Sequence, residues 1–240
     1  MEPVHIGRFY PGGPARVSLS ELPPLAAFTA PEVLRLQKEG AVVVDTRPVI
    51  QFAVAHVQAS VHIALTGQYA WWVARLLGLD TRLIIAGEDL AQVRESQVRL
   101  ARVGVGNVAG YLADGVVSWI KNGFELEYIP QVTVQDFIEL RERESERGGI
   151  ALLDVREPGE WSGGVIENSA RIPLGELQSR TGELDRERLL VVHCRGGNRS
   201  SLATSLLRRA GFRDVANLTG GFEAWKTAGL PYVVPEGDAI

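Results

Sequence analysis

Residues 191–201 read Val191-Val192-His193-Cys194-Arg195-Gly196-Gly197-Asn198-Arg199-Ser200-Ser201, and they hold the only cysteine of the 240-residue chain. An apolar, β-branched pair delivers this thiol to a short glycine-rich loop, and a helical pattern starts where the loop ends. Backbone N–H groups of such a loop point inward, and the dipole of the following helix adds partial positive charge. The segment therefore predicts an anion cradle at the carboxyl end of a strand, in which the Cys194 thiol ionises readily.

Arg195 and Arg199 add two fixed positive charges beside this thiol. A buried structural cysteine is the alternative, but a core cysteine needs neither the glycines nor the arginines that follow it. Four residues separate Cys194 from Arg199. Cysteine phosphatases have one residue more in a similar cradle, so a phosphatase or an arsenate reductase is the disfavoured enzyme class.

The tighter loop resembles the active site of rhodanese sulfurtransferases, which closes around one extra sulfur atom on the cysteine. Three other segments resemble the same family in the same order: Asp154-Val155-Arg156-Glu157-Pro158-Gly159-Glu160-Trp161, then Ala170-Arg171-Ile172-Pro173-Leu174, then Asn217-Leu218-Thr219-Gly220-Gly221-Phe222-Glu223-Ala224-Trp225 with Gly229-Leu230-Pro231. One departure is Val165, which stands where the family usually has a structural histidine.

The second half of the chain repeats the first. Asp45-Thr46-Arg47 reappears 109 residues later as Asp154-Val155-Arg156, and Gly115 and Trp119 reappear 106 residues later as Gly221 and Trp225. Each half reads as helix, strand, loop, strand, helix, strand, helix, which indicates an α/β fold. With the resemblance, this implies two tandem rhodanese-like domains, each a mostly parallel five-stranded sheet with helices on both faces.

The expected domains are an N-terminal arm at 1–27, an inactive rhodanese-like domain at 28–129 and an active one at 130–240, joined at Tyr128-Ile129-Pro130-Gln131. In the second domain we expect a helix capped by Thr133 and Asp136 that runs to about Arg147. Strands are expected at 151–155 and 189–193, and a helix at 200–210 that Gly211 ends.

The first copy lacks the chemistry of the second. Gly87 occupies the thiol position, Glu88 and Asp89 replace Arg195 and Gly196, and Gln92 replaces Arg199. A loop with no nucleophile and two added carboxylates should repel anions. A metal site at Glu88 and Asp89 is the alternative to a favourable helix N-terminus.

We expect Cys194 to be the nucleophile and to carry a persulfide between two half-reactions. The resemblance implies an anionic donor such as thiosulfate and a thiol or cyanide acceptor. The binding residues expected are those of the loop: Arg195, Gly196, Gly197, Asn198, Arg199 and Ser200. Two alternatives stay open, because Arg199 could form a helix-start salt bridge turned away from the pocket, and Arg195 could be a solvated rim residue.

Asp154 and Arg156 are expected to support the loop, and Trp161 either lines the pocket or packs in the core. His193 precedes the cysteine on a strand, so its side chain should point to the opposite face, and we do not assign it as a base.

Composition narrows the function further. A net charge of −4 without a long charge run does not favour a nucleic-acid partner. No stretch reaches the ~18 apolar residues of a membrane span, and residues 1–27 lack the apolar run of a signal peptide. A single cysteine fits a reducing cytoplasm. Four scattered histidines argue against a metal, and no cofactor is expected.

The first half contains an aromatic cluster that the second copy lacks, at Thr66-Gly67-Gln68-Tyr69-Ala70-Trp71-Trp72. It resembles a segment of the rhodanese modules linked to metallo-β-lactamase-fold persulfide dioxygenases. The arm at Gly7-Arg8-Phe9-Tyr10-Pro11-Gly12-Gly13 resembles the link between those two parts. A separate protein of that fold is therefore a candidate partner. The alternative for Trp71 and Trp72 is packing between the repeats, and the alternative to catalysis is a sulfur-carrier or docking module.

Overall fold

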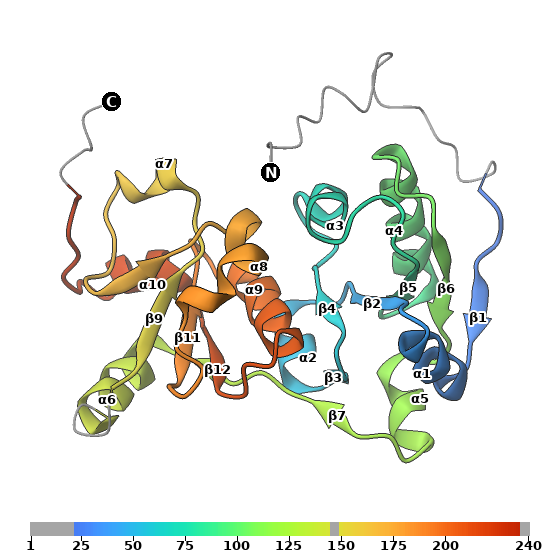
Figure 1. Cartoon of the computed structure of the whole chain (residues 1–240), viewed down its shortest axis with the longest axis horizontal. Coiled ribbons are helices and arrows are strands. Elements are labelled where there is room, and N and C mark those ends of the chain that lie inside the picture. The colour runs from blue at the N-terminus through green and yellow to red at the C-terminus, as the bar shows by residue number, and fades with distance from the viewer. Residues whose placement is uncertain (1–21, 145–148, 236–240) are drawn as a thin grey trace. The chain divides into compact units, whose positions relative to one another are not determined.

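A computed structural model describes residues 22–144 and 149–235 of the chain. The chain divides into two compact units, residues 1–127 and 128–240. In Figure 1 the elements of the first unit run from blue to green and those of the second from yellow-green to red. Residues 1–21 of the expected arm, and the expected helix end at Arg147, lie outside the described residues. No helix in the described ranges is both long enough and apolar enough to cross a membrane.

The first unit is built on a five-stranded parallel sheet. Its strands lie side by side in the order β1 (Ala26–Phe28), β6 (Val108–Leu112), β5 (Leu83–Ala86), β2 (Val42–Asp45) and β4 (Val61–His62). A small antiparallel pair joins β3 (His56–Val57) to β7 (Leu126–Glu127). Strand β1 begins at Ala26, inside the stretch 1–27 that was expected to be an N-terminal arm. The sequence does not indicate this strand, because three residues are too few to show the alternation of a strand.

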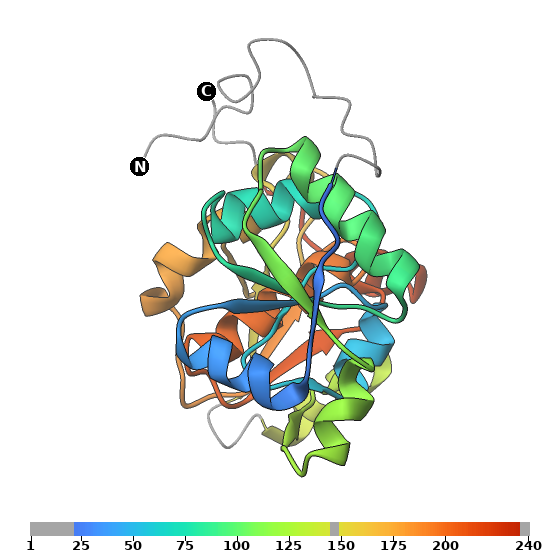
Figure 2. The same cartoon turned by 90° about the vertical axis from the view of Figure 1, so that its right-hand side faces the viewer.

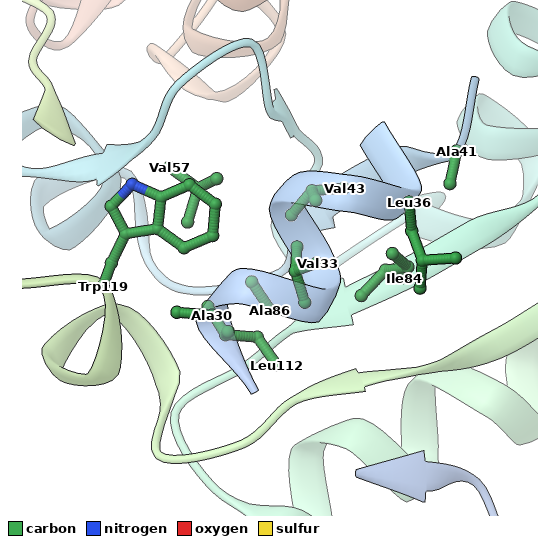
Figure 3. Close-up of a cluster of buried hydrophobic side chains, with 10 residues drawn as sticks. All are labelled: Ala30, Val33, Leu36, Ala41, Val43, Val57, Ile84, Ala86, Leu112 and Trp119. Carbon is green, nitrogen blue, oxygen red and sulfur yellow. The ribbon is translucent and has the colours of Figure 1, made fainter. Parts of the chain in front are cut away.

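Helices cover both faces of this sheet (Figure 2). One face carries α3 (Tyr69–Leu77) and α4 (Leu90–Arg102), and the other carries α1 (Ala30–Lys38) and α5 (Gly115–Lys121), while the short α2 (Val49–Val54) follows β2. The apolar side chains of α1 recur every three residues, so that Ala30, Val33 and Leu36 form one stripe. Figure 3 shows this stripe against the sheet, with Trp119 of α5 beside Val57.

The second unit repeats this arrangement. Its parallel sheet has the order β8 (Gln131–Val132), β12 (Val215–Leu218), β11 (Leu190–His193), β9 (Ala151–Asp154) and β10 (Ser169–Arg171). Its helices are α6 (Val134–Glu144), α7 (Pro158–Trp161), α8 (Leu177–Arg180), α9 (Asn198–Arg209) and α10 (Gly221–Thr227). Two parallel five-stranded sheets with one strand order confirm the predicted α/β class.

Local chemistry explains where these helices begin. Thr133 and Asp136 form the predicted capping box, in which each backbone N–H donates to the other side chain at 3.1 Å. Phe137 of the capped helix then packs edge-to-face on Trp225 of α10, with ring centres 6.0 Å apart. Helix α9 starts two residues before the predicted Ser200, because Gly197 caps it in the left-handed region at φ 106°.

Candidate active site

Cys194 follows β11, a central strand of its sheet, and its side chain is only 2% exposed. The backbone N–H of Gly197 donates a hydrogen bond to the sulfur at 3.1 Å. The hydroxyl of Ser200 lies 3.4 Å from the sulfur and 3.1 Å from the Gly197 carbonyl oxygen. These donors, at the start of an α-helix, favour negative charge on the sulfur.

The loop around the thiol is held from behind by the N-terminus of α10. Phe222 donates its backbone N–H to the Cys194 carbonyl at 2.8 Å, and Glu223 donates to the Arg195 carbonyl at 3.0 Å. This close approach needs Gly221, where a Cβ atom would lie 2.3 Å from the Cys194 carbonyl oxygen. The double glycine of the closing segment therefore positions the cysteine loop.

Arg199 forms a two-pronged ion pair with Glu160 of α7. Its Nη2 donates to Oε1 of Glu160 at 2.8 Å, and Nη1 donates to Oε2. These bonds raise the pKa of Arg199, with a further contribution from charge on Cys194, although burial opposes the rise. The same bonds lower the pKa of Glu160. Arg199 thus forms an ion pair with Glu160 and still lies close enough to Cys194 for their charges to interact.

Arg195 lies at the rim of the loop. Its side chain is 70% exposed, and its Nε donates to Oε1 of Glu223 at 3.1 Å. Gly196 and Asn198, the other loop residues expected to bind substrate, are also exposed. The buried part of the cradle thus consists of Cys194, Gly197 and Ser200.

Asp154 and Arg156 form a buried pair at the carboxyl end of β9. The Arg156 side chain bonds both carboxylate oxygens, at 2.6–3.0 Å, and its Nη2 also donates to the Gly164 carbonyl at 2.9 Å. Asp45 and Arg47 make the equivalent pair in the first unit. Because that unit has no thiol, the pair serves the fold of both units.

Neither His193 nor Trp161 forms a hydrogen bond with the Cys194 sulfur among the bonds of the described residues. The imidazole of His193 is fully buried, with Nε2 3.8 Å from Oδ2 of Asp154, and burial lowers its pKa. It is therefore neutral at pH 7. The Trp161 ring is partly buried, and the guanidinium of Arg171 lies 5.5 Å from its centre.

The corresponding loop of the first unit is filled by its own side chains. Oε1 of Gln92 accepts the Glu88 backbone N–H at 2.8 Å, and a Cβ atom on Gly87 would lie 3.0 Å from that oxygen. Asp89 caps α4 by accepting the Gln92 backbone N–H at 2.7 Å. Asp89 therefore has the helix-start position, and among residues 22–144 and 149–235 no group of three or more His, Cys, Asp or Glu side chains is placed to hold a metal ion.

Sequence reasoning missed the two carboxylates of the site. Glu160 belongs to the segment Asp154 to Trp161, yet it received no role, and Glu223 was only part of the closing segment. A salt bridge was considered for Arg199, but neither partner was identified, because Glu160 lies 39 residues from Arg199 and Glu223 lies 28 residues from Arg195 along the chain. The comparison of the two copies held the available signal. Both copies keep Asp-x-Arg, but only the copy with the thiol has a Glu four residues after the Arg, at Glu160, where the first copy has Gln51.

Comparisons with known proteins show the family of the chain, and the match to a family model lies in the second unit. Residues 135–228 match the family described as the rhodanese-like domain. A sulfurtransferase of Allochromatium vinosum is 36% identical over 102 residues, which are 42% of this chain and 95% of that protein. A putative mitochondrial thiosulfate sulfurtransferase of Schizosaccharomyces pombe is 30% identical, over 40% of this chain and 80% of that protein. A rhodanese-related protein of Thermoplasma volcanium has a crystal structure with 32% identity and a TM-score of 0.39, covering 44% of this chain and 99% of that one.

Proposed function

The chain belongs to the rhodanese-like family of sulfurtransferases, and on that premise we propose that it transfers sulfane sulfur through a persulfide on Cys194. The proposed donor is an anion such as thiosulfate, and the proposed acceptor is a thiol or cyanide. The observation that carries the proposal is the bond from the Gly197 N–H to the sulfur of the buried Cys194.

The reaction divides into two displacements at sulfur. In the first, the Cys194 thiolate attacks the outer sulfur of thiosulfate, the S–S bond of the donor breaks, and sulfite leaves with the electron pair. In the second, cyanide or an acceptor thiolate attacks the terminal sulfur of the persulfide, and the Cys194 thiolate is released. Charge and electrons balance within each displacement.

The loop supports this chemistry by holding one small anion. The persulfide places its negative charge one atom beyond the Cys194 sulfur, next to the amide donors at the start of α9. Preorganised N–H groups of this kind stabilise charge without reorganising during the reaction. The hydroxyl of Ser200 is the side-chain donor of the same buried group.

Intact mass measurement tests the proposal. Incubation with thiosulfate should make the chain heavier by one sulfur atom, and a thiol reductant should reverse the gain. Cys194→Ser in the full chain should show no gain and no transfer to cyanide. A gain in that variant would place the chemistry elsewhere, and wild-type transfer by it would refute the role of Cys194.

Turnover distinguishes an enzyme from a sulfur carrier. An enzyme should form thiocyanate steadily from thiosulfate and cyanide, in many equivalents per chain. A carrier that serves only a dedicated protein would release one equivalent and stop.

A further inference from the structure

Each arginine of the cysteine loop is paired with a carboxylate. Arg199 is held by Glu160 through both carboxylate oxygens, and Arg195 is held by Glu223. These four charges cancel one another, and Lys226 also lies 3.6 Å from Glu223 at the exposed outer pair. Stabilisation of an anion then falls mainly to the Gly197 amide, the Ser200 hydroxyl and the start of α9.

The two ion pairs differ in how strongly they are fixed. In the inner pair, the Arg199 and Glu160 side chains are 22% and 31% exposed, whereas in the outer pair Arg195 and Glu223 are 70% and 47% exposed. Water and salt screen the outer pair, so its charges are weakly coupled. The inner pair should therefore set the charge that a donor meets beside Cys194.

Glu160 is also held in place from its own helix. Its Oε2 accepts the backbone N–H of Glu157 at 3.0 Å, which closes a capping box at the start of α7. The carboxylate would lose this bond if it swung away to release Arg199. Glu160 thus stays beside the guanidinium when a donor arrives.

We propose that Glu160 is a specificity-determining residue, which cancels the charge of Arg199 and so selects sulfane sulfur donors with one negative charge over doubly charged ones. The inference rests on the proposed function of Cys194. The preferred donors are therefore monoanionic, namely organic persulfides and thiosulfonates, and thiosulfate is the less preferred donor. Glu160 acts through Arg199 and touches no reacting atom.

Two donors of nearly equal shape isolate the effect of charge. Methanethiosulfonate carries a methyl group in place of one of the three oxygens of thiosulfate, so it has one negative charge instead of two. Both give their outer sulfur to the Cys194 thiolate by cleavage of one S–S bond, and they release methanesulfinate and sulfite respectively. We therefore compare kcat/KM for thiosulfate with kcat/KM for methanethiosulfonate, using cyanide as acceptor. A change in this ratio between the wild type and a variant measures how that side chain selects donors by charge.

Three single variants form a charge series. Glu160→Gln keeps the shape of the side chain and one oxygen that can accept from Glu157 and Arg199, but it leaves the positive charge of Arg199 uncancelled. The thiosulfate-to-methanethiosulfonate ratio of kcat/KM should therefore rise about fivefold, mainly through a lower KM for thiosulfate. Arg199→Gln leaves the carboxylate unpaired, so the ratio should fall by a similar factor. The matched control Glu223→Gln removes an exposed carboxylate and should change the ratio less than about twofold.

The outcomes separate this inference from the proposed function. Equal losses with both donors, or an unchanged ratio in both Glu160→Gln and Arg199→Gln, would mean that the pair only supports the loop, and would overturn the inference. Because the two variants shift the ratio in opposite directions, either one alone decides the matter if the other does not fold. Absence of a Cys194 persulfide with both donors in the wild-type chain would instead refute the proposed function itself.

Discussion

The backbone N–H of Gly197 points at the sulfur of Cys194 from 3.1 Å, and it does so only because Gly197 adopts φ 106°. An L-residue with a side chain rarely adopts that conformation. The hydrogen bond to the sulfur and the cap of α9 thus depend on one backbone geometry.

Gly197→Ala should therefore lower transfer about tenfold and destabilise the fold by ~1 kcal/mol, because the strained φ would rotate the amide away from the sulfur. Gly196→Ala is the matched control, since a Cβ atom there meets nothing within 4 Å. Rates of thiocyanate formation and urea unfolding midpoints measure both effects. Equal behaviour of the two variants would argue against the amide as the anion donor.

Gly221→Ala should disrupt the loop from behind. The new Cβ atom would lie 2.3 Å from the Cys194 carbonyl oxygen, and backbone atoms cannot yield as a side chain would. We expect a loss of about 1–3 kcal/mol in unfolding free energy, together with lost transfer. Gly182→Ala has no atom within 4 Å of its Cβ and should leave both unchanged. An unaltered Gly221→Ala protein would contradict the close packing of α10 on the loop.

Arg199→Ala should reduce thiosulfate transfer about ten- to a hundredfold, or ~1.4–2.7 kcal/mol of transition-state stabilisation. It removes a partly buried cation and leaves Glu160 unpaired near the thiol. Arg195→Ala should raise KM for thiosulfate more than it lowers kcat, because this exposed side chain contributes to binding alone. Steady-state kinetics of the two variants check this, and unchanged constants in both would show that neither arginine takes part in donor binding or transfer.

Acid should weaken the fold from about pH 6.5 downward. Burial lowers the pKa of His56, His62 and His193 from the ordinary value of 6.5, so below that pH the unfolded chain binds protons that the folded chain does not. Above pH 6.5 both states are neutral and the effect vanishes. Each histidine then contributes a loss of up to ~1.4 kcal/mol per pH unit until its folded pKa is reached.

Urea unfolding between pH 8 and pH 5 measures this slope. The carboxylates with lowered pKa, such as Glu160, lose their contribution only below about the ordinary value of 4.5, so they do not account for a loss near pH 6. His193→Gln should make the slope shallower. A flat profile down to pH 5 would show that the imidazoles are not kept neutral.

Local patterns in the sequence predicted the fold class and the place of the cysteine. The repeat spacing and the apolar strands predicted the α/β class, and the loop after Val192 predicted that Cys194 lies at a strand end. The shortest strands were not predicted, because a strand such as β4 has two residues and shows no alternation of apolar and polar side chains. The pairing of Arg199 with Glu160 also escaped, because it forms only when α7 packs beside α9 and no local rule joins residues 39 apart.

The filled loop of the first unit has a consequence for engineering. Replacing Gly87 with cysteine would place the new Cβ atom 3.0 Å from the side-chain oxygen of Gln92, which already accepts the Glu88 backbone N–H. A thiol added at position 87 would therefore enter a loop whose space is taken by Gln92. That single substitution should not give the first unit a cradle like the one around Cys194.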